Sequence, residues 1–73
     1  MTDRTLITGA TGFVGGLLLN RLVAEGRPVR ALVRSLGDRE RLPDPRVELA
    51  IGHLGDEDSL VRAADGCEVV YHV

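Results

Sequence analysis

The sequence of 73 residues contains no lysine and no tryptophan, a single cysteine, Cys67, and only two aromatic residues, Phe13 and Tyr71. Because unpaired bases stack on aromatic side chains, and because the net charge is −2, this composition argues against nucleic acid as a partner. One cysteine excludes an intrachain disulfide, and we expect Cys67 to be a small buried residue at the start of the last strand. No apolar run approaches the length of a membrane span, and the first strand leaves no room for a signal peptide, which predicts a cytoplasmic protein without a membrane partner.

Hydrophobic periodicity and turn residues divide the chain into alternating strands and helices. Strands are predicted at residues 4–8, 29–34, 47–51 and 68–73, helices at 13–25 and 57–64, and a single turn at 39–42 before Pro43 and Pro45 enforce a loop. Right-handed crossovers then give an α/β fold whose parallel strands lie in the order 3-2-1-4. We therefore expect residues 1–73 to form one domain, the N-terminal half of a three-layer Rossmann-type sheet, and such a small core predicts marginal stability.

Both predicted helices have recognisable ends and an apolar side. The first ends at Gly26, with Pro28 beyond it, and the second begins at the N-cap Asp56 and ends at Gly66. The residues predicted to face the sheet are Val14, Leu18 and Leu22 in the first helix, widened by Leu17, Leu19 and Val23, and Leu60, Val61 and Ala64 in the second.

The most informative segment is Thr8-Gly9-Ala10-Thr11-Gly12-Phe13-Val14-Gly15, which joins the first strand to the first helix. Its three glycines allow a sharp turn, a close approach of the backbone to a pyrophosphate and tight packing of the helix on the sheet. The helix N-terminus adds unpaired N–H groups and the positive end of a dipole. The strand-loop-helix context favours a dinucleotide phosphate site over a purely structural turn. The candidate residues of this site are Gly9, Thr11, Gly12, Phe13, Val14 and Gly15.

The same segment resembles the extended or atypical short-chain dehydrogenase/reductases, a group that includes NAD-dependent epimerase/dehydratase-like and NmrA-like proteins. The resemblance continues through residues 29–34, 52–56 and 69–73. It implies an NAD(P)-binding Rossmann fold and an oxidoreductase, epimerase or dehydratase as the parent protein. Enzymes of this group generally use a Tyr-x-x-x-Lys pair, whereas here Tyr71 is followed by two residues and no lysine exists. We therefore assign no catalytic residue, and we expect the catalytic half of the fold to be absent from this chain.

Arg34 lies at the end of the second predicted strand, near the position where NAD-binding domains carry an acidic residue for the adenosine ribose 2′-OH. A guanidinium instead matches a 2′-phosphate and leaves the free hydroxyls of NAD without an acceptor, so NADP(H) is favoured over NAD(H). Ser35 either adds a hydroxyl to that phosphate or serves the turn. Arg30 and Arg39 are either assistants to Arg34 or surface charges.

The segment Gly52-His53-Leu54-Gly55-Asp56 stands where the family usually shows Gly-Asp-Leu-x-Asp, whose first Asp and Leu flank the adenine. The resemblance therefore makes His53 and Leu54 candidate adenine contacts, with histidine in place of the aspartate. His72 is expected to pack near the cofactor rather than to transfer protons. The two histidines and Cys67 show no ligand spacing, so no metal is predicted.

Three functions stay open on this sequence: the cofactor-binding portion of an NAD(P)-dependent reductase or epimerase-like enzyme, inactive by itself; an NmrA-like regulator that binds NADP(H) without turnover; or a portion without a ligand. The last strand, residues 68–73, is apolar and lies at the sheet edge in the predicted order. We expect exposed apolar surface there, and the isolated chain is predicted either to be partly molten or to self-associate with Val69, Val70 and Tyr71 at the contact.

Overall fold

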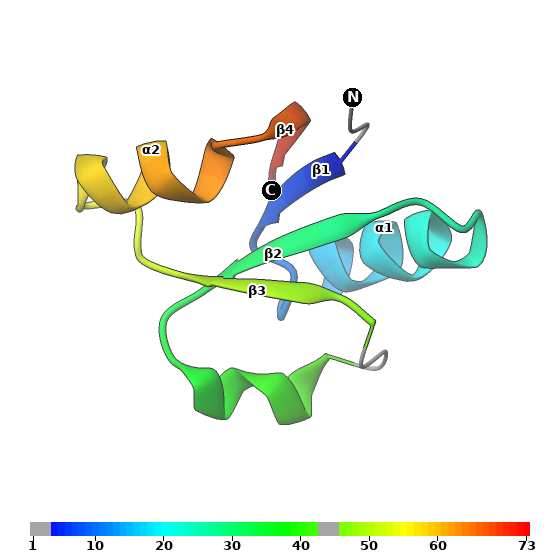
Figure 1. The fold of residues 1–73 in the computed structure, drawn as a ribbon. Coiled ribbons are helices and arrows are strands. Elements are labelled where there is room, and N and C mark those ends of the chain that lie inside the picture. Colours follow the sequence, from blue (N-terminus) through cyan, green and yellow to red (C-terminus); the bar gives the residue numbers. More distant parts are fainter. Residues whose placement is uncertain (1–3, 43–45) are drawn as a thin grey trace.

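The computed structural model describes residues 4–42 and 46–73, and within them the chain forms a parallel sheet with helices on both faces (Figure 1). The elements are, in order, β1 (Arg4–Thr8), α1 (Phe13–Ala24), β2 (Val29–Val33), η1 (Leu36–Arg41), β3 (Glu48–Ile51), α2 (Glu57–Ala64) and β4 (Cys67–His72). β1 pairs with β2 on one side and with β4 on the other, and β2 pairs with β3. The order β3-β2-β1-β4 confirms the predicted Rossmann-type arrangement of the strands.

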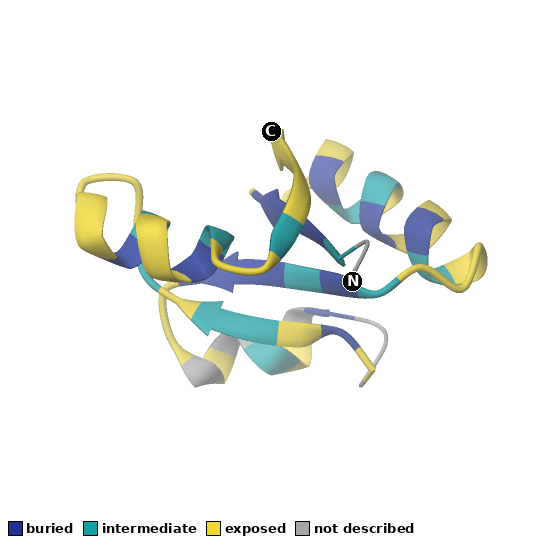
Figure 2. Cartoon of the chain, turned by 45° about the horizontal axis from the view of Figure 1, so that its top comes forward, coloured by how far each residue is buried: buried dark blue, intermediate teal, exposed yellow. Residues whose placement is uncertain are grey.

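Two apolar layers form the core, one on each face of the sheet. The layer beneath α1 contains Ile7, Ala31 and Val33, and the layer beneath α2 contains Leu6 and Leu32. Because successive side chains of a strand point to opposite faces, the uninterrupted apolar runs of β1 and β2 supply both layers. β1 and β2 are accordingly buried along most of their length, whereas β4 is exposed (Figure 2).

The buried side of α1 is rotated from the predicted one. Gly15, Leu19 and Leu22 are buried, and Leu18 and Val23 are partly buried, but the side chains of Val14 and Leu17 are 62% and 56% exposed. Gly15 has no side chain, so the first turn of the helix comes closest to the rest of the chain at this residue. Val14, one position earlier, therefore points to solvent, and the predicted inward role of Val14 and Leu17 is wrong.

Helix α2 begins and ends as predicted, and the predicted inward residues Leu60 and Ala64 pack, partly buried, against the apolar layer, but its fully buried residues are others. The Asp56 side chain accepts a hydrogen bond from the Ser59 N–H, and Gly66 follows the helix with a φ of +78°. Ser59 and Ala63, four residues apart, are buried, whereas Val61 is 65% exposed and its predicted inward role is wrong. Val61 lies two residues after Ser59, which places it close to the opposite face of the helix, and it therefore faces solvent. In the described part of the chain no helix is long and apolar enough to cross a membrane.

The connections differ from the prediction in small ways. The 3-10 helix η1 starts at Leu36 and is longer than the expected single turn, while Pro43 and Pro45 lie outside the described residues. Gly26, with a φ of +76°, follows α1 as expected. Cys67 opens β4 but is only partly buried, with its sulfur 3.7 Å from the carbonyl oxygen of Ala63. The prediction of a buried cysteine is therefore only partly correct.

The edge strand β4 exposes apolar side chains, as the sequence predicts. Val69, Val70 and Tyr71 are 41%, 53% and 41% exposed. Between this strand and α2 lies an apolar hollow of about 420 Å³, to which Leu6, Leu54, Leu60 and Val70 contribute. β4 pairs with β1 alone among the described strands, which leaves its other edge without hydrogen-bond partners there.

Candidate functional site

A cavity of about 530 Å³ lies at the carboxyl ends of the strands. Each strand supplies a residue at or just beyond its end: Thr8 from β1, Arg34 after β2, Gly52 after β3 and Val73 after β4. In a parallel sheet these ends share one edge, and the edge is open where neighbouring connections leave in opposite directions. Here α1 and α2 leave to opposite faces of the sheet (Figure 1). The cavity therefore lies where such folds hold ligands.

The glycine loop at one wall of the cavity has two glycines that the fold requires. Gly9 has a φ of +75°, and a Cβ atom on it would lie 2.8 Å from the Val73 carbonyl oxygen. A Cβ atom on Gly15 would lie 2.0 Å from the Gly9 carbonyl oxygen. Gly12 is different, because its φ is −84° and a Cβ atom there would meet only the Gly9 oxygen, at 3.4 Å. Turn geometry and packing thus explain why glycine is needed at positions 9 and 15, but no contact within the described protein requires a glycine at position 12.

The N-termini of α1 and α2 differ in their caps and in the charge of their first turns. Gly12 caps α1 without a side-chain hydrogen bond, and the first turn of α1 contains no acidic residue. Helix α2, by contrast, is capped by the Asp56 carboxylate and carries Glu57 and Asp58 in its first turn. The leading N–H groups of α1 thus keep their positive potential, whereas those of α2 face carboxylates. Only the α1 end suits an anion.

A polar contact joins the carboxyl ends of β1 and β4 beside the cavity. The Thr8 hydroxyl oxygen lies 2.7 Å from His72 Nδ1, and the Val73 N–H donates to the same hydroxyl at 3.3 Å. Thr8 is 6% exposed, so this buried hydroxyl is satisfied by the neighbouring strand. His72 therefore joins β4 to β1 beside the cavity, and its packing against a cofactor stays a prediction.

Arg34 and Ser35 line the opposite wall of the cavity, and both side chains are exposed. No hydrogen bond or ion pair joins the Arg34 guanidinium to another described residue. Its five N–H donors are accordingly available to an anion at this wall.

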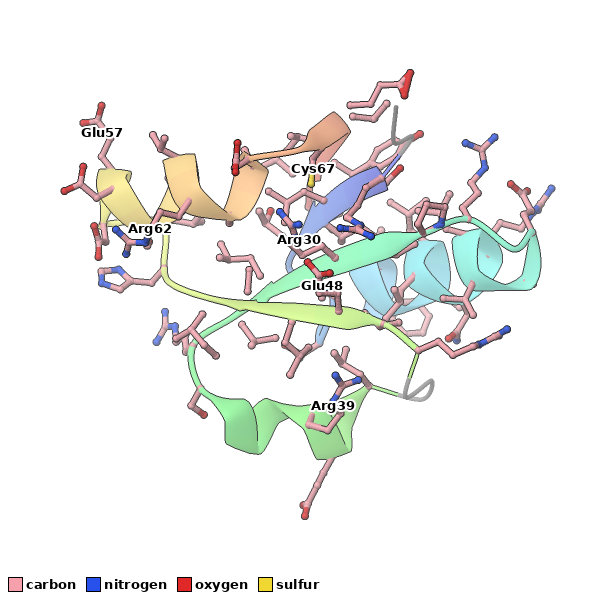
Figure 3. The ribbon with its side chains drawn as sticks, viewed as in Figure 1. Arg30, Arg39, Glu48, Glu57, Arg62 and Cys67 are labelled. Carbon is pink, nitrogen blue, oxygen red and sulfur yellow. The ribbon has the colours of Figure 1, made fainter. Side chains whose placement is uncertain are left out.

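The two other arginines considered beside Arg34 do not line the cavity. Arg30 points to the α2 face of the sheet, where its Nη1 donates to the carbonyl oxygens of Ala63 and Asp65 at 2.7 Å each, and its Nε pairs with Glu48 (Figure 3). Glu48 also pairs with Arg4. Arg30 thus satisfies carbonyl groups at the end of α2 and serves the fold. Arg39 lies on η1, apart from this cluster (Figure 3).

The loop between β3 and α2 forms a third wall. His53, Leu54 and Gly55 line the cavity, and the Gly55 N–H donates to His53 Nδ1 at 3.1 Å. The imidazole is thereby folded onto its own loop, and Leu54, 58% exposed, adds an apolar surface. An apolar side chain beside an imidazole gives a wall that suits a flat heterocycle.

Six of the ten predicted site residues line the cavity, and the other four do not. Those at the cavity are Gly9, Thr11, Arg34, Ser35, His53 and Leu54. Gly12, Phe13, Val14 and Gly15 follow the loop into α1 without lining the cavity, and Phe13 is 83% exposed. Residues at the cavity that the sequence did not single out are Thr8, Leu32, Val33, Gly52, Gly55 and Val73. The position of each at or just beyond a predicted strand end is the signal that could have found most of them. No group of three metal-ligating side chains occurs in residues 4–42 and 46–73.

Strand ends that frame a cavity, beside a glycine turn and a helix N-terminus without a side-chain cap, are typical of a Rossmann-type dinucleotide-binding domain. A family model described as NAD(P)H-binding matches residues 9–73. The chain belongs to this family, within the epimerase/dehydratase-like short-chain dehydrogenase/reductases.

Relatives of known sequence and structure agree with this assignment. The chain is 44% identical over 68 residues to sterol demethylase protein B of Methylococcus capsulatus and 38% identical over 73 residues to a putative dihydroflavonol 4-reductase of Synechocystis. These matches cover 93% and 100% of the chain but 21% of either relative, so the chain spans about a fifth of their length. The crystal structure of gox2253 superposes with a TM-score of 0.87 at 43% identity, covering 99% of this chain and 22% of that one. A short-chain dehydrogenase/reductase superfamily protein from Agrobacterium tumefaciens, solved with bound NAD, gives a TM-score of 0.74 at 31% identity, covering 96% and 20%.

Proposed function

We propose that this chain binds the adenosine and pyrophosphate end of NADP(H), in preference to NAD(H), as the cofactor-binding portion of a reductase or epimerase-like protein. The glycine loop and the N-terminus of α1 hold the pyrophosphate, through Gly9 and the segment from Thr11 to Gly15. Arg34 and Ser35 hold the 2′-phosphate, and His53 and Leu54 flank the adenine. The single observation that carries the cofactor choice is the Arg34 guanidinium, which lies at the cavity wall without a partner among the described residues.

The physical argument for the 2′-phosphate rests on charge and shape. NAD presents two ribose hydroxyls at this position, which an acidic side chain accepts, whereas the described cavity wall offers no carboxylate. A phosphate brings acceptor oxygens that a guanidinium binds through paired, charge-assisted hydrogen bonds. The Agrobacterium relative holds NAD, so the preference for NADP(H) depends on Arg34 of this chain and not on that relative.

The chain by itself is proposed to bind the cofactor without turning it over. No lysine is present in the 73 residues, and the one tyrosine, Tyr71, lies within the edge strand β4. An NmrA-like regulator would have the same cofactor site, and it would differ from an enzyme in parts that this chain does not contain.

Calorimetric titration with 2′,5′-ADP and with 5′-AMP tests the proposal. The unaltered chain should bind 2′,5′-ADP about tenfold or more tightly than 5′-AMP, since a charge-assisted bidentate pair contributes about 1.5–3 kcal/mol. Arg34→Asp should reverse this order. Arg62→Asp makes the same charge change on α2, outside the cavity, and should leave the order unaltered. Equal affinities for the two nucleotides before and after Arg34→Asp would reduce Arg34 to a surface charge.

We also propose that β4 pairs with β4 of a second copy when the chain stands alone. The exposed edge and apolar side chains of this strand support that contact, together with the hollow beside α2. The other edge of the sheet is less suited to pairing, because β3 carries the charged Glu48 in an ion-pair cluster. Val69, Val70 and Tyr71 would lie at the contact.

A further inference from the structure

The buried hydroxyl group of Ser59 holds the loop that follows β3 through hydrogen bonds to its backbone. Ser59, in the first turns of α2, is 2% exposed. Its hydroxyl donates to the Asp56 carbonyl oxygen at 2.8 Å, with the His53 carbonyl oxygen at 3.3 Å as a second acceptor. The same oxygen accepts the His53 N–H at 3.2 Å. One small side chain thus satisfies backbone groups at both ends of the His53–Asp56 turn.

Ser59 also lies directly against the point where the chain leaves β3. A Cβ atom on Gly52 would lie 2.5 Å from Ser59 Oγ and 2.6 Å from Ser59 Cβ, so the glycine backbone and the serine are in close contact. The Gly52 N–H donates to the Val33 carbonyl oxygen at 2.9 Å, which fixes Gly52 to β2. Ser59 is therefore packed between its own helix and the sheet, and it has no room to shift toward Gly52.

The loop above Ser59 has further internal hydrogen bonds that depend on its shape. The Ser59 N–H donates to Asp56 Oδ1 at 3.2 Å, and the Asp56 N–H donates to the His53 carbonyl oxygen at 3.0 Å. The outward side of this turn carries His53 and Leu54, which line the cavity. The placement of these two side chains thus follows from a network centred on Ser59.

We infer that Ser59 is a positioning residue for the nucleobase: it never contacts the nucleotide, and it sets the height and angle of the His53–Leu54 wall against which the base lies. The inference deepens the proposed function and rests on it. Ser59 combines a hydroxyl with a side chain small enough for its site. Alanine would fill nearly the same space and remove every hydroxyl contact, while a larger residue would collide with Gly52.

The test separates recognition of the base from recognition of phosphate and ribose. NMR titration of the 73-residue chain with 5′-AMP and with ribose 5-phosphate gives two dissociation constants. The ratio of the ribose 5-phosphate constant to the 5′-AMP constant measures what the base contributes to affinity. Ser59→Ala should lower this ratio about three- to tenfold, the effect of one or two lost hydrogen bonds on the wall. The affinity for ribose 5-phosphate should change less than about twofold, because the glycine loop is not attached to Ser59. Asp58→Ala, at an exposed neighbour in the same helix, should leave both constants unaltered.

A lowered ratio with unaltered ribose 5-phosphate affinity supports the positioning role of Ser59. Equal weakening of both ligands by Ser59→Ala, or an unchanged ratio, refutes the positioning role and leaves the proposed function standing. Failure of the unaltered chain to bind either ligand refutes the proposed function and this inference with it. If Ser59→Ala does not fold, Ser59→Cys carries the test, because its thiol is a weaker donor and acceptor and is larger than the hydroxyl beside Gly52. The ratio should then fall while the affinity for ribose 5-phosphate is kept, and an unchanged ratio refutes the positioning role.

Discussion

Gly15 and Gly16 are neighbours in the first turns of α1, and replacing each by alanine tests how the helix meets the glycine loop. A Cβ atom on Gly15 would lie 2.0 Å from the Gly9 carbonyl oxygen and 2.6 Å from the carbonyl carbon. Both are backbone atoms, so the loop and helix must move apart by about 1 Å (3.0 − 2.0) to reach the shortest separation that Cβ atoms ordinarily show. A Cβ atom on Gly16 would meet one atom, the Ala10 carbonyl oxygen, at an ordinary 3.5 Å.

The two substitutions should therefore shift stability in opposite directions. Gly15→Ala is expected to cost about 1–3 kcal/mol or more, as overpacked sites do, and each kcal/mol lowers the Tm of a domain of this size by about 4–8 °C. Gly16→Ala should stabilise the chain by up to about 1 kcal/mol, because alanine loses less backbone freedom than glycine when a helix forms. Since the Gly9 turn is part of the cavity wall, Gly15→Ala should also weaken nucleotide binding about tenfold or more.

Thermal unfolding followed by circular dichroism, with calorimetric titration of 2′,5′-ADP at a temperature where both variants are folded, measures these effects. Gly16→Ala is the matched control, because it adds the same methyl group one residue further along the same helix. A Gly15→Ala variant that melts at or above the unaltered chain and binds as tightly would show that the close approach of α1 to the Gly9 turn is not needed, and the reasoning would be refuted.

Two further predictions concern the surface. Sedimentation should show concentration-dependent dimers of the unaltered chain, and Val70→Lys should shift them to monomer by placing a charge on the β4 edge, whereas a chain that is monomeric at every concentration would contradict the edge contact. Hydrogen bonds from Arg21 and then Arg27 hold the pKa of Glu25 below its ordinary value. An NMR titration should therefore find this pKa lowered, and Arg21→Gln should raise it toward the ordinary value. Because the folded-state pKa is the lower one, the stabilisation is present above the ordinary pKa of glutamate and is lost as the pH falls through the lowered value; no change on Arg21→Gln would rule out this cause.

Local sequence signals were sufficient for the elements and their order. The strand Val29–Val33 is found where a mainly apolar run predicts it, within one residue of the expected end. The cap Asp56 and the left-handed Gly26 and Gly66 are found at the predicted helix ends. These features depend on the backbone preferences of single residues, which act over a few positions. Handedness rules then leave few ways to arrange four parallel strands.

The faces of the helices were less predictable, because they depend on what lies opposite. Val14 and Val61 fit an apolar stripe equally well in sequence, yet both are exposed, while Gly15 and Ser59 are buried. A close approach of two backbones selects the smallest residue and not the most apolar one. The same limit applies to the site, where the Thr8 hydroxyl and the Val73 N–H meet only after β1 and β4 have paired.

The contact between Thr8 and His72 joins positions 64 residues apart in the chain. Closing so long a loop costs chain entropy before any contact compensates it, so the pairing of β1 with β4 is expected to be a late step in folding. A nucleotide in the cavity that Gly9 and Val73 both line would bind only molecules in which this step is complete, and at one hundred times its dissociation constant it would favour them by about 2.7 kcal/mol. Cofactor supply would then act as a folding agent for this small domain, with its last strand the part most dependent on it.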